Sequence, residues 1–415
     1  MAATASTSIC KALMKPSSSP SEPVGPGLFG AVQRRGAVPA LVGDAAYLGA
    51  MLRTEATLAA AQARVGLFPA EHAAAIAAAC EPSHFDIDDL GRAAQASGTL
   101  VVPLVERLRA AVGGEAAAHV HFGATSQDII DTATMLVAQA ALSAIVAEVD
   151  AAGDAAARLA TEHTQTVMAG RTLLQQALPT TFGAKAAGWL SALDDAAELL
   201  TSLRERRLAV QLGGGAGTLD AMHPHGSAIA ADLARELGLA APDMPWHTNR
   251  SRIGEFAGAL GVTAGALAKP ARDVTLLAQT EISEVREGVP GRGGSSAMAH
   301  KRNPIAAIAT LANTTQAPGL VASLLTATSG HEHERAAGSW HAEWHPLREL
   351  LVAVGSAAAW LADCLTNLEI DPDRMRANIG PDLEKLLDPP DYLASAAGIV
   401  AVAVRRHTIR REPPT

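Results

Sequence analysis

A long stretch without helix breakers constrains the fold of this chain most. From Thr125 to His163 the sequence has no Pro and a single Gly. A hydroxyl at Thr125 followed by an acid at Asp128 predicts the start of a helix, which would be roughly 40 residues and about 60 Å long. Apolar residues recur along it at spacings of three and four, as Met135, Ala138, Leu142, Ile145 and Val149. Such a seam is typical of a helix packed against other long helices.

Four more long helical runs follow, at residues 181–212, 251–287, 303–325 and 340–368. Together with 125–163 they predict an all-α protein built on a central bundle of five long helices. Hydrophobic residues make up 48% of the chain but aromatic residues only 3%. A core of Ala, Leu and Val favours close-packed helices over sheets, and no strand alternation is found.

The chain is expected to divide into four parts. These are a disordered tail at 1–25, a small N-terminal helical domain at 26–124, the bundle at 125–368 and a short C-terminal helical segment at 369–415. The tail is rich in Ser and Pro and has no acidic residue before Glu22. A transit peptide would share that composition, but only Lys11 and Lys15 are basic, which favours a tail.

Composition excludes several classes of function. A net charge of −9 argues against broad nucleic-acid binding. No apolar run is long enough to cross a bilayer. Cys10, Cys80 and Cys364 stand far apart and form no C-x-x-C pair, so neither a disulfide framework nor a zinc site is predicted. We expect a cytoplasmic protein with no nucleic-acid or membrane partner.

A short segment at residues 294–304 brings together two hydroxyls, a Lys and an Asn. Its sequence is Gly-Ser-Ser-Ala-Met-Ala-His-Lys-Arg-Asn-Pro. A Gly-rich run precedes it, which lets the backbone close over a ligand. Ser295 offers a hydroxyl that can exchange a proton, and Lys301 offers a fixed positive charge. This combination suits a small anionic substrate whose negative charge grows during reaction.

A second chemical segment lies at the start of the longest predicted helix. Residues 119–128 place hydroxyls and backbone N–H groups at a helix N-terminus, where the helix dipole favours an anion. A further Gly-rich run at 212–218 lacks the spacing of a phosphate-binding loop, and we interpret it as a turn between helices.

Both segments resemble the fumarase/aspartase superfamily, through G-S-S-x-M-x-x-K-x-N-P and G-A-T-S-x-D. Members make or break a bond β to a carboxylate, through a carbanion stabilised as an aci-carboxylate. The resemblance implies a homotetramer whose active sites each draw segments from three copies, acting on a small polycarboxylate without a cofactor. It also implies a C-terminal domain that is truncated here. One departure is Ala299, where the family often has Pro.

The run Gly-Arg-Thr-Leu-Leu-Gln-Gln-Ala-Leu-Pro at 170–179 distinguishes between branches of this superfamily. In the lyases a His normally follows Gly-Arg-Thr. It pairs with a Glu that stands seven residues after the Lys that corresponds to Lys301. Here those positions are Leu173 and Ile308. The run resembles the cycloisomerase branch, which lactonises 3-carboxy-cis,cis-muconate in protocatechuate (β-ketoadipate) breakdown, although that branch often has Trp in place of Leu173.

The resemblance also implies roles for individual residues. Lys301 and Arg335 would stabilise the developing charge, and either Lys301 or Ser295 would donate the proton. Substrate contacts would come from Ser97, Thr99, His121, Thr125, Ser126, Gln127, Arg171, Thr172, Leu173, Gln175, Met298 and Asn303. No metal is expected at His331–Glu334, because residues at alternate positions splay apart on a helix.

Two other hypotheses stay open. An adenylosuccinate-lyase-like elimination that releases fumarate would use a similar signature loop, but Leu173 and Ile308 leave it without its acid–base pair. A helical protein without catalysis would not need Ser295, Lys301, Asn303 and Arg335 together.

Overall fold

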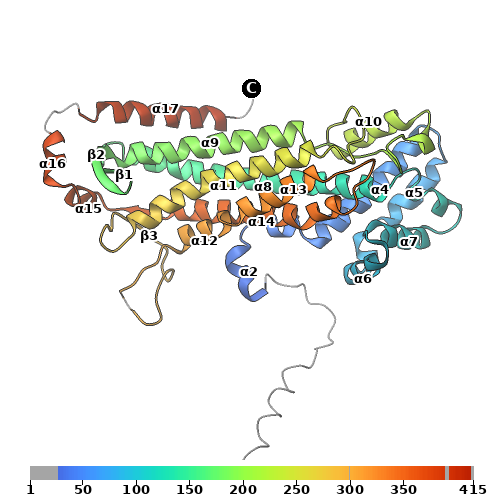
Figure 1. Cartoon of the computed structure of the whole chain (residues 1–415), viewed down its shortest axis with the longest axis horizontal. Coiled ribbons are helices and arrows are strands. Elements are labelled where there is room, and N and C mark those ends of the chain that lie inside the picture. Colours follow the sequence, from blue (N-terminus) through green and yellow to red (C-terminus); the bar gives the residue numbers. More distant parts are fainter. Residues whose placement is uncertain (1–26, 299, 388–391, 413–415) are drawn as a thin grey trace, which may run out of the picture.

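The computed structural model describes residues 27–298, 300–387 and 392–412, and it is a long assembly of helices (Figure 1). The predicted all-α fold with a long-helix bundle is confirmed. Cys10, the predicted tail at 1–25 and Ala299 lie outside the described residues.

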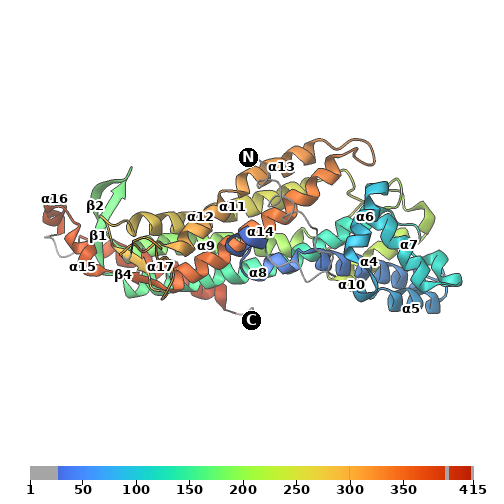
Figure 2. The ribbon, with the colours of Figure 1, turned by 90° about the horizontal axis from the view of Figure 1, so that it is seen from below.

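The chain enters through short helices that gather mainly at one end of the molecule (Figure 2). These elements are α2 (Gly27–Gln33), α3 (Val38–Leu41), α4 (Asp44–Arg64), α5 (Ala70–Ala79), η1 (Pro82–His84), α6 (Ile87–Ser97), α7 (Val101–Val112) and η2 (Glu115–His119).

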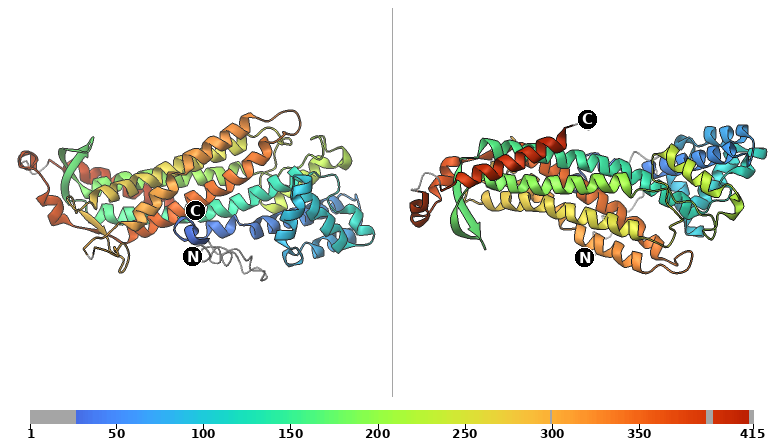
Figure 3. Two further views of the ribbon diagram at one scale, coloured as in Figure 1. Left: turned by 60° about the horizontal axis from the view of Figure 1, so that its bottom comes forward. Right: turned by 90° about the horizontal axis from the view of Figure 1, so that it is seen from above.

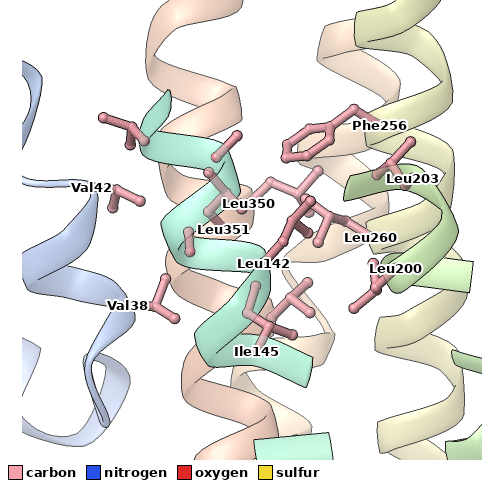
Figure 4. Close-up of a cluster of buried hydrophobic side chains, with 14 of the residues drawn as sticks. Val38, Val42, Leu142, Ile145, Leu200, Leu203, Phe256, Leu260, Leu350 and Leu351 are labelled. Atoms are coloured by element: carbon pink, nitrogen blue, oxygen red, sulfur yellow. The ribbon is translucent and has the colours of Figure 1, made fainter. Parts of the chain in front are cut away.

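The bundle is built on α8 (Ser126–Glu162), which spans 37 residues and packs against α9, α14 and α4. Its predicted seam is buried throughout, and Leu142 and Ile145 lie in the core between helices (Figure 4). The other bundle helices are α9 (Phe182–Arg206), α11 (Ser251–Leu277), α12 (Ile305–Thr314), α13 (Ala317–Ser329) and α14 (Ser339–Thr366). The small helices η3 (Asp220–Met222) and α10 (Gly226–Leu237) lie between α9 and α11 in the chain.

The prediction that no apolar segment is long enough to cross a bilayer was wrong by length and composition alone, because α8 and α14 meet both criteria. Their most apolar windows are 72% and 83% buried inside the protein, as expected of core helices.

Several predicted helices end early or break. The run at 303–325 is two helices, because Pro318 lacks an N–H and its ring opposes the carbonyl of Thr314. The run at 251–287 stops at Leu277, and the run at 181–212 stops at Arg206.

The sequence shows no strand alternation, yet the described residues form two small sheets beside the helices. Strands β1 (Val167–Thr172) and β2 (Gln175–Thr181) form an antiparallel hairpin that projects from the end of the bundle (Figure 3). Strand β3 (Val285–Glu287) pairs with β4 (Leu368–Ile370). Strands of three to seven residues are too short to show a clear alternation of apolar and polar side chains.

The C-terminal part runs back along the bundle. It consists of α15 (Pro372–Ala377), α16 (Pro381–Glu384), η4 (Lys385–Leu387) and α17 (Ala394–Arg411). Helix α17 lies on α9 and α8 (Figure 3). His407 joins it to both helices, because its Nδ1 lies 2.8 Å from Asp194 Oδ1 and its Nε2 lies 2.8 Å from Asp154 Oδ1.

Candidate active site

The start of α8 is held by a buried carboxylate. Thr125 and Asp128 form a capping box, in which the Thr125 backbone N–H donates to Asp128 Oδ2 at 3.0 Å. Asp128 also accepts from the backbone N–H groups of Gly213 and Gly214, at 3.0 and 2.9 Å, and lies 2.7 Å from His247 Nε2. The Gly-rich turn at 212–218 therefore fixes the helix start, and close contacts from Pro245 and His247 leave no room for a Cβ at Gly213.

Arg335 meets this helix start from a loop far along the chain. Its Nη1 donates to Thr125 Oγ1 at 3.1 Å, and its Nη2 donates to the Gly215 carbonyl at 2.9 Å. The half-buried Ser126 lies beside Thr125 in the first turn. A guanidinium and an N-terminal turn thus face the same place, which favours an anion.

His121 stands four residues before Thr125 and contacts a buried acid. Its φ of 61° lies in the left-handed region, and its Nδ1 lies 2.6 Å from Oε1 of the buried Glu55. Burial lowers the pKa of His121, but the charge and hydrogen bond of Glu55 outweigh burial and raise the pKa above its ordinary value. His121 therefore stays protonated to a higher pH than a free histidine.

Gln127 is the one helix-start candidate that lies in the core. Its Nε2 donates to the His247 carbonyl at 2.8 Å and to Asp131 Oδ2 at 3.1 Å, and the side chain is fully buried. Asp131 also binds Arg250 Nη1 at 2.6 Å, and Arg250 Nη2 binds Glu343 at 2.5 Å. In this structure Gln127 belongs to the ionic network under the helix start and does not face a ligand.

Ser97 and Thr99 lie in the turn between α6 and α7. Ser97 Oγ donates to the Thr99 carbonyl at 2.9 Å, and Thr99 Oγ1 accepts from the Val101 N–H at 3.4 Å. His341, in the first turn of α14, lies 3.0 Å from the Gly98 carbonyl. The turn is thereby joined to the segment that carries Arg335.

Arg171 sits in the projecting hairpin and already holds a carboxylate. Its Nη1 and Nη2 donate to the two oxygens of the fully buried Glu284, at 2.9 and 2.6 Å. Thr172, Leu173 and Gln175 lie exposed at the hairpin tip, where Leu173 is 96% exposed. In this structure Arg171 anchors the hairpin, and the tip is what reaches outward.

The signature loop, at residues 294–304, is held at its base by hydrogen bonds and is exposed to solvent at its end. Asn303 donates to the Gly293 carbonyl from both its backbone N–H, at 2.9 Å, and its Nδ2, at 3.0 Å. Gly293 has a φ of +77°, and a Cβ there would lie 2.2 Å from the Asn303 carbonyl oxygen. Ser295 is half-buried, while Met298 and Lys301 are exposed. The loop thus presents a flexible cation beyond a fixed base.

The sequence candidates form three separate groups. The first surrounds the start of α8, the second lies at the hairpin tip beyond the opposite end of α8, and the third is the signature loop (Figure 1). Helix α8 alone has 37 residues, which is about 55 Å at 1.5 Å per residue. One small substrate cannot reach all three groups within a single protomer.

Among the described residues, no cluster of three or more His, Cys, Asp or Glu side chains could hold a metal ion. In the alternating run at His331–Glu334, the buried His331 lies 3.1 Å from Glu343 Oε1, and Glu332 accepts from the Ala337 N–H at 2.8 Å. These two side chains serve local structure.

Similarity to known proteins identifies the family of this chain. A model of the lyase family matches residues 33–319. The chain belongs to the lyase family. A 3-carboxy-cis,cis-muconate cycloisomerase from Bradyrhizobium diazoefficiens is 46% identical over 347 residues, covering 83% of this chain and 77% of the relative. A nitrosuccinate lyase from Streptomyces davaonensis is 45% identical over 365 residues, covering 85% and 77%.

The fold of this lyase-family chain also matches a solved relative. The crystal structure of the 3-carboxy-cis,cis-muconate lactonizing enzyme from Pseudomonas putida superposes with a TM-score of 0.87 at 36% identity. The match covers 93% of this chain and 100% of that one. The resemblance predicted from the sequence motifs is confirmed at the level of the family.

Sequence reasoning missed the buried acids that hold the candidate residues in this lyase-family protein. Glu55 orders His121, and Glu284 orders Arg171. Glu55 falls at helical spacing from the apolar Met51, Leu52, Leu58 and Ala59, which places it on the buried face of α4. Because an unpaired charge is rarely buried, this position was a signal that Glu55 has a polar partner. No comparable pattern surrounds Glu284.

Proposed function

We propose that this protein is a cycloisomerase that lactonises 3-carboxy-cis,cis-muconate, in protocatechuate breakdown. The observation that carries the proposal is the pair of apolar residues, Leu173 and Ile308, at the positions where the lyases have an acid–base pair. Both are exposed, at 96% and 45%, so neither is needed to fill the core of the protomer. The relatives named for this reaction support the same assignment.

The reaction needs no base to activate its nucleophile. A carboxylate of the substrate is already ionised, and it attacks the alkene carbon β to another carboxylate, which forms a C–O bond. The electron pair of the alkene moves onto that second carboxylate as an aci-carboxylate, and a proton then forms the C–H bond. No atom is lost, so the product is an isomer. Apolar side chains at 173 and 308 are compatible with this chemistry.

The charged residues have the properties that such a substrate requires. Arg335 and the start of α8, with Thr125 and Ser126, would bind one carboxylate, and His121, held by Glu55, would be a further contact. Lys301 would stabilise the aci-carboxylate, and either Lys301 or Ser295 would donate the proton. The remaining predicted contacts stay proposals on the same basis: Ser97, Thr99, Gln127, Arg171, Thr172, Gln175, Met298 and Asn303.

The separation of the three groups requires other copies of the chain. We propose a homotetramer in which the helix start of one copy, the hairpin tip of a second and the signature loop of a third enclose each substrate. The exposed Leu173 and Leu174 at the hairpin tip suit insertion into another copy. The division at 26–124, 125–368 and 369–415 and a cytoplasmic location belong to the same proposal.

A second candidate function is a β-elimination that yields fumarate. The nitrosuccinate lyase relative favours it, because its identity of 45% is nearly that of the cycloisomerase relative. This reaction removes a proton from carbon, so it needs a base, and the positions of Leu173 and Ile308 supply none. We rank it second for that reason.

One assay separates the two. The purified protein is mixed with 3-carboxy-cis,cis-muconate in the presence of EDTA, and loss of the ultraviolet absorbance of the diene is followed. Nitrosuccinate is tested in parallel by nitrite release. We expect rapid diene loss, lowered roughly 10²- to 10³-fold by Lys301→Met, because one charge on the transition state is removed. The matched control is Lys385→Met, at an exposed lysine on η4, which should leave turnover unchanged. Nitrite release without diene loss would overturn the proposal.

A further inference from the structure

A cavity of about 500 Å³ lies between the N-terminal helices and the bundle. Helices α4 and α6 form one side, and α8, α14 and the start of α11 form the other. Its walls are mainly apolar, with Leu48, Met51, Ile87, Leu90, Ile130 and Leu347. A volume of this size falls in the range that encloses a small organic molecule.

The charged groups on the walls leave a net negative charge, because Asp131 and Glu343 share one guanidinium while Asp88 and Arg92 at the exposed edge add one charge of each sign. Arg250 is bound by Asp131 and Glu343, all three nearly fully buried, and Arg348 donates to Asp44 at 2.7 Å. Tyr47, whose ring lies beneath the Arg348 guanidinium, has a pKa raised by burial, so its hydroxyl is neutral. An added carboxylate in the buried part of the cavity would face Asp131 and Glu343, two acids that already share one guanidinium, which disfavours it.

The cavity does not share residues with the candidate active site. Its walls include Ile130, Asp131 and Thr134 on α8, beyond the first turn that carries Thr125 and Ser126. The network of Asp131 and Arg250 lies between the two. A polycarboxylate substrate matches the helix start and does not match this mainly apolar cavity with its net negative charge.

We propose that this cavity is a second ligand site, which takes a neutral, mainly apolar molecule built on one or two rings. Size and the apolar wall select a ring, and the net negative charge of the wall selects against anions. The site is independent of the proposed reaction, because its recognition uses none of the groups assigned to the reaction.

The probe is 4-fluoroacetophenone, followed by fluorine NMR of the full-length protein. Its matched control is 4-fluorobenzoate, which has nearly the same shape but carries a negative charge. We expect saturable binding of the ketone with a Kd on the order of 1 mM, typical for a ligand of this size. We expect at least tenfold weaker binding of the benzoate.

Two variants fill the cavity from opposite walls. Gly91 in α6 lines the cavity, and an added Cβ there meets no heavy atom within 4 Å. Gly91→Phe therefore adds a ring at the cavity wall, and it also removes a glycine from the interior of a helix, which favours the helix. Thr134→Met places a longer side chain on the α8 wall, and it removes the hydrogen bonds of Oγ1 to the Ile130 carbonyl and to Tyr47. Both should weaken ketone binding at least tenfold, while Gly91→Ala should change it less than twofold. Unchanged melting temperatures establish that the variants are folded.

Three results would overturn the site. The benzoate could bind as tightly as the ketone, both filling variants could leave ketone binding unchanged, or 3-carboxy-cis,cis-muconate could displace the ketone competitively. The last result would make the cavity part of the substrate site. Diene turnover is scored separately, so the proposed reaction and this inference can fail independently of each other.

Discussion

At the scale of single residues, buried acids hold half-buried candidate residues in place. Glu55 is 1% exposed and holds His121 in a left-handed backbone conformation beside the start of α8. The stabilisation from this pair depends on pH. Because the pKa of His121 is raised on folding, the stabilisation is fully present below the pKa of an unfolded histidine, near 6.5. It is lost as the pH rises through the higher pKa of the folded state.

Glu55→Gln should remove this dependence. At pH 5.5 we expect the variant to be less stable by about 1–3 kcal/mol, the range for a hydrogen bond to a charged group. The difference should shrink as the pH rises, because His121 becomes neutral in the wild type as well. Urea unfolding at several pH values measures it, with Glu106→Gln on the exposed face of α7 as the control. A stability difference that stays constant from pH 5.5 to 9 would contradict the role of Glu55.

The sequence predicted these candidates better than their partners. His121, Thr125 and Arg335 stand in recognisable motifs, and the structure brings Thr125 and Arg335 within 3.1 Å. The acids that hold the candidates, Glu55 and Glu284, come from other helices or loops and belong to no motif. Pairings across such distances depend on tertiary packing, which a single sequence does not reveal.

At the scale of elements, long helices were predictable and short strands were not. A period that repeats over many turns identifies α8, whereas a hairpin of two short strands offers little pattern. The hairpin turn is unusual as well. Leu173 and Leu174 have φ values of 51° and 65°, as in a type I′ turn, which normally uses Asn and Gly. Branched side chains in this conformation are strained, which indicates that the tip is retained for function.

Replacing the tip by Leu173→Asn with Leu174→Gly should therefore separate stability from activity. We expect the free energy of unfolding to rise by about 1–2 kcal/mol as backbone strain is relieved. Diene turnover should fall, because the apolar tip is lost. Thermal unfolding and the diene assay measure the two effects. Leu173→Trp is the control, since it keeps an apolar tip and the strained backbone. A less stable double variant, or one with full turnover, would contradict this account.

At the scale of the whole molecule, the length of the bundle determines how a site can be built. Helix α8 separates the helix-start group from the hairpin by about 55 Å. The sequence motifs implied shared sites only through resemblance, whereas the geometry gives a physical reason. A protomer this elongated has its candidate groups at different places along its length (Figure 2). Activity should therefore require that different copies of the chain each contribute an intact group to the same site.

Two inactive variants with changes in different groups should restore activity when they assemble together. Lys301→Met alters the signature loop and Arg335→Met alters the helix-start group. If each site takes these groups from different copies, random mixing leaves about a quarter of the sites with both groups intact. Co-refolding the variants in equal amounts and measuring diene turnover tests this. The control mixes Lys301→Met with Ser295→Ala, which alter the same loop, so every site keeps one defect and turnover should not exceed the mean of the two. Equal recovery in both mixtures, or none in either, would show that the groups do not meet between copies.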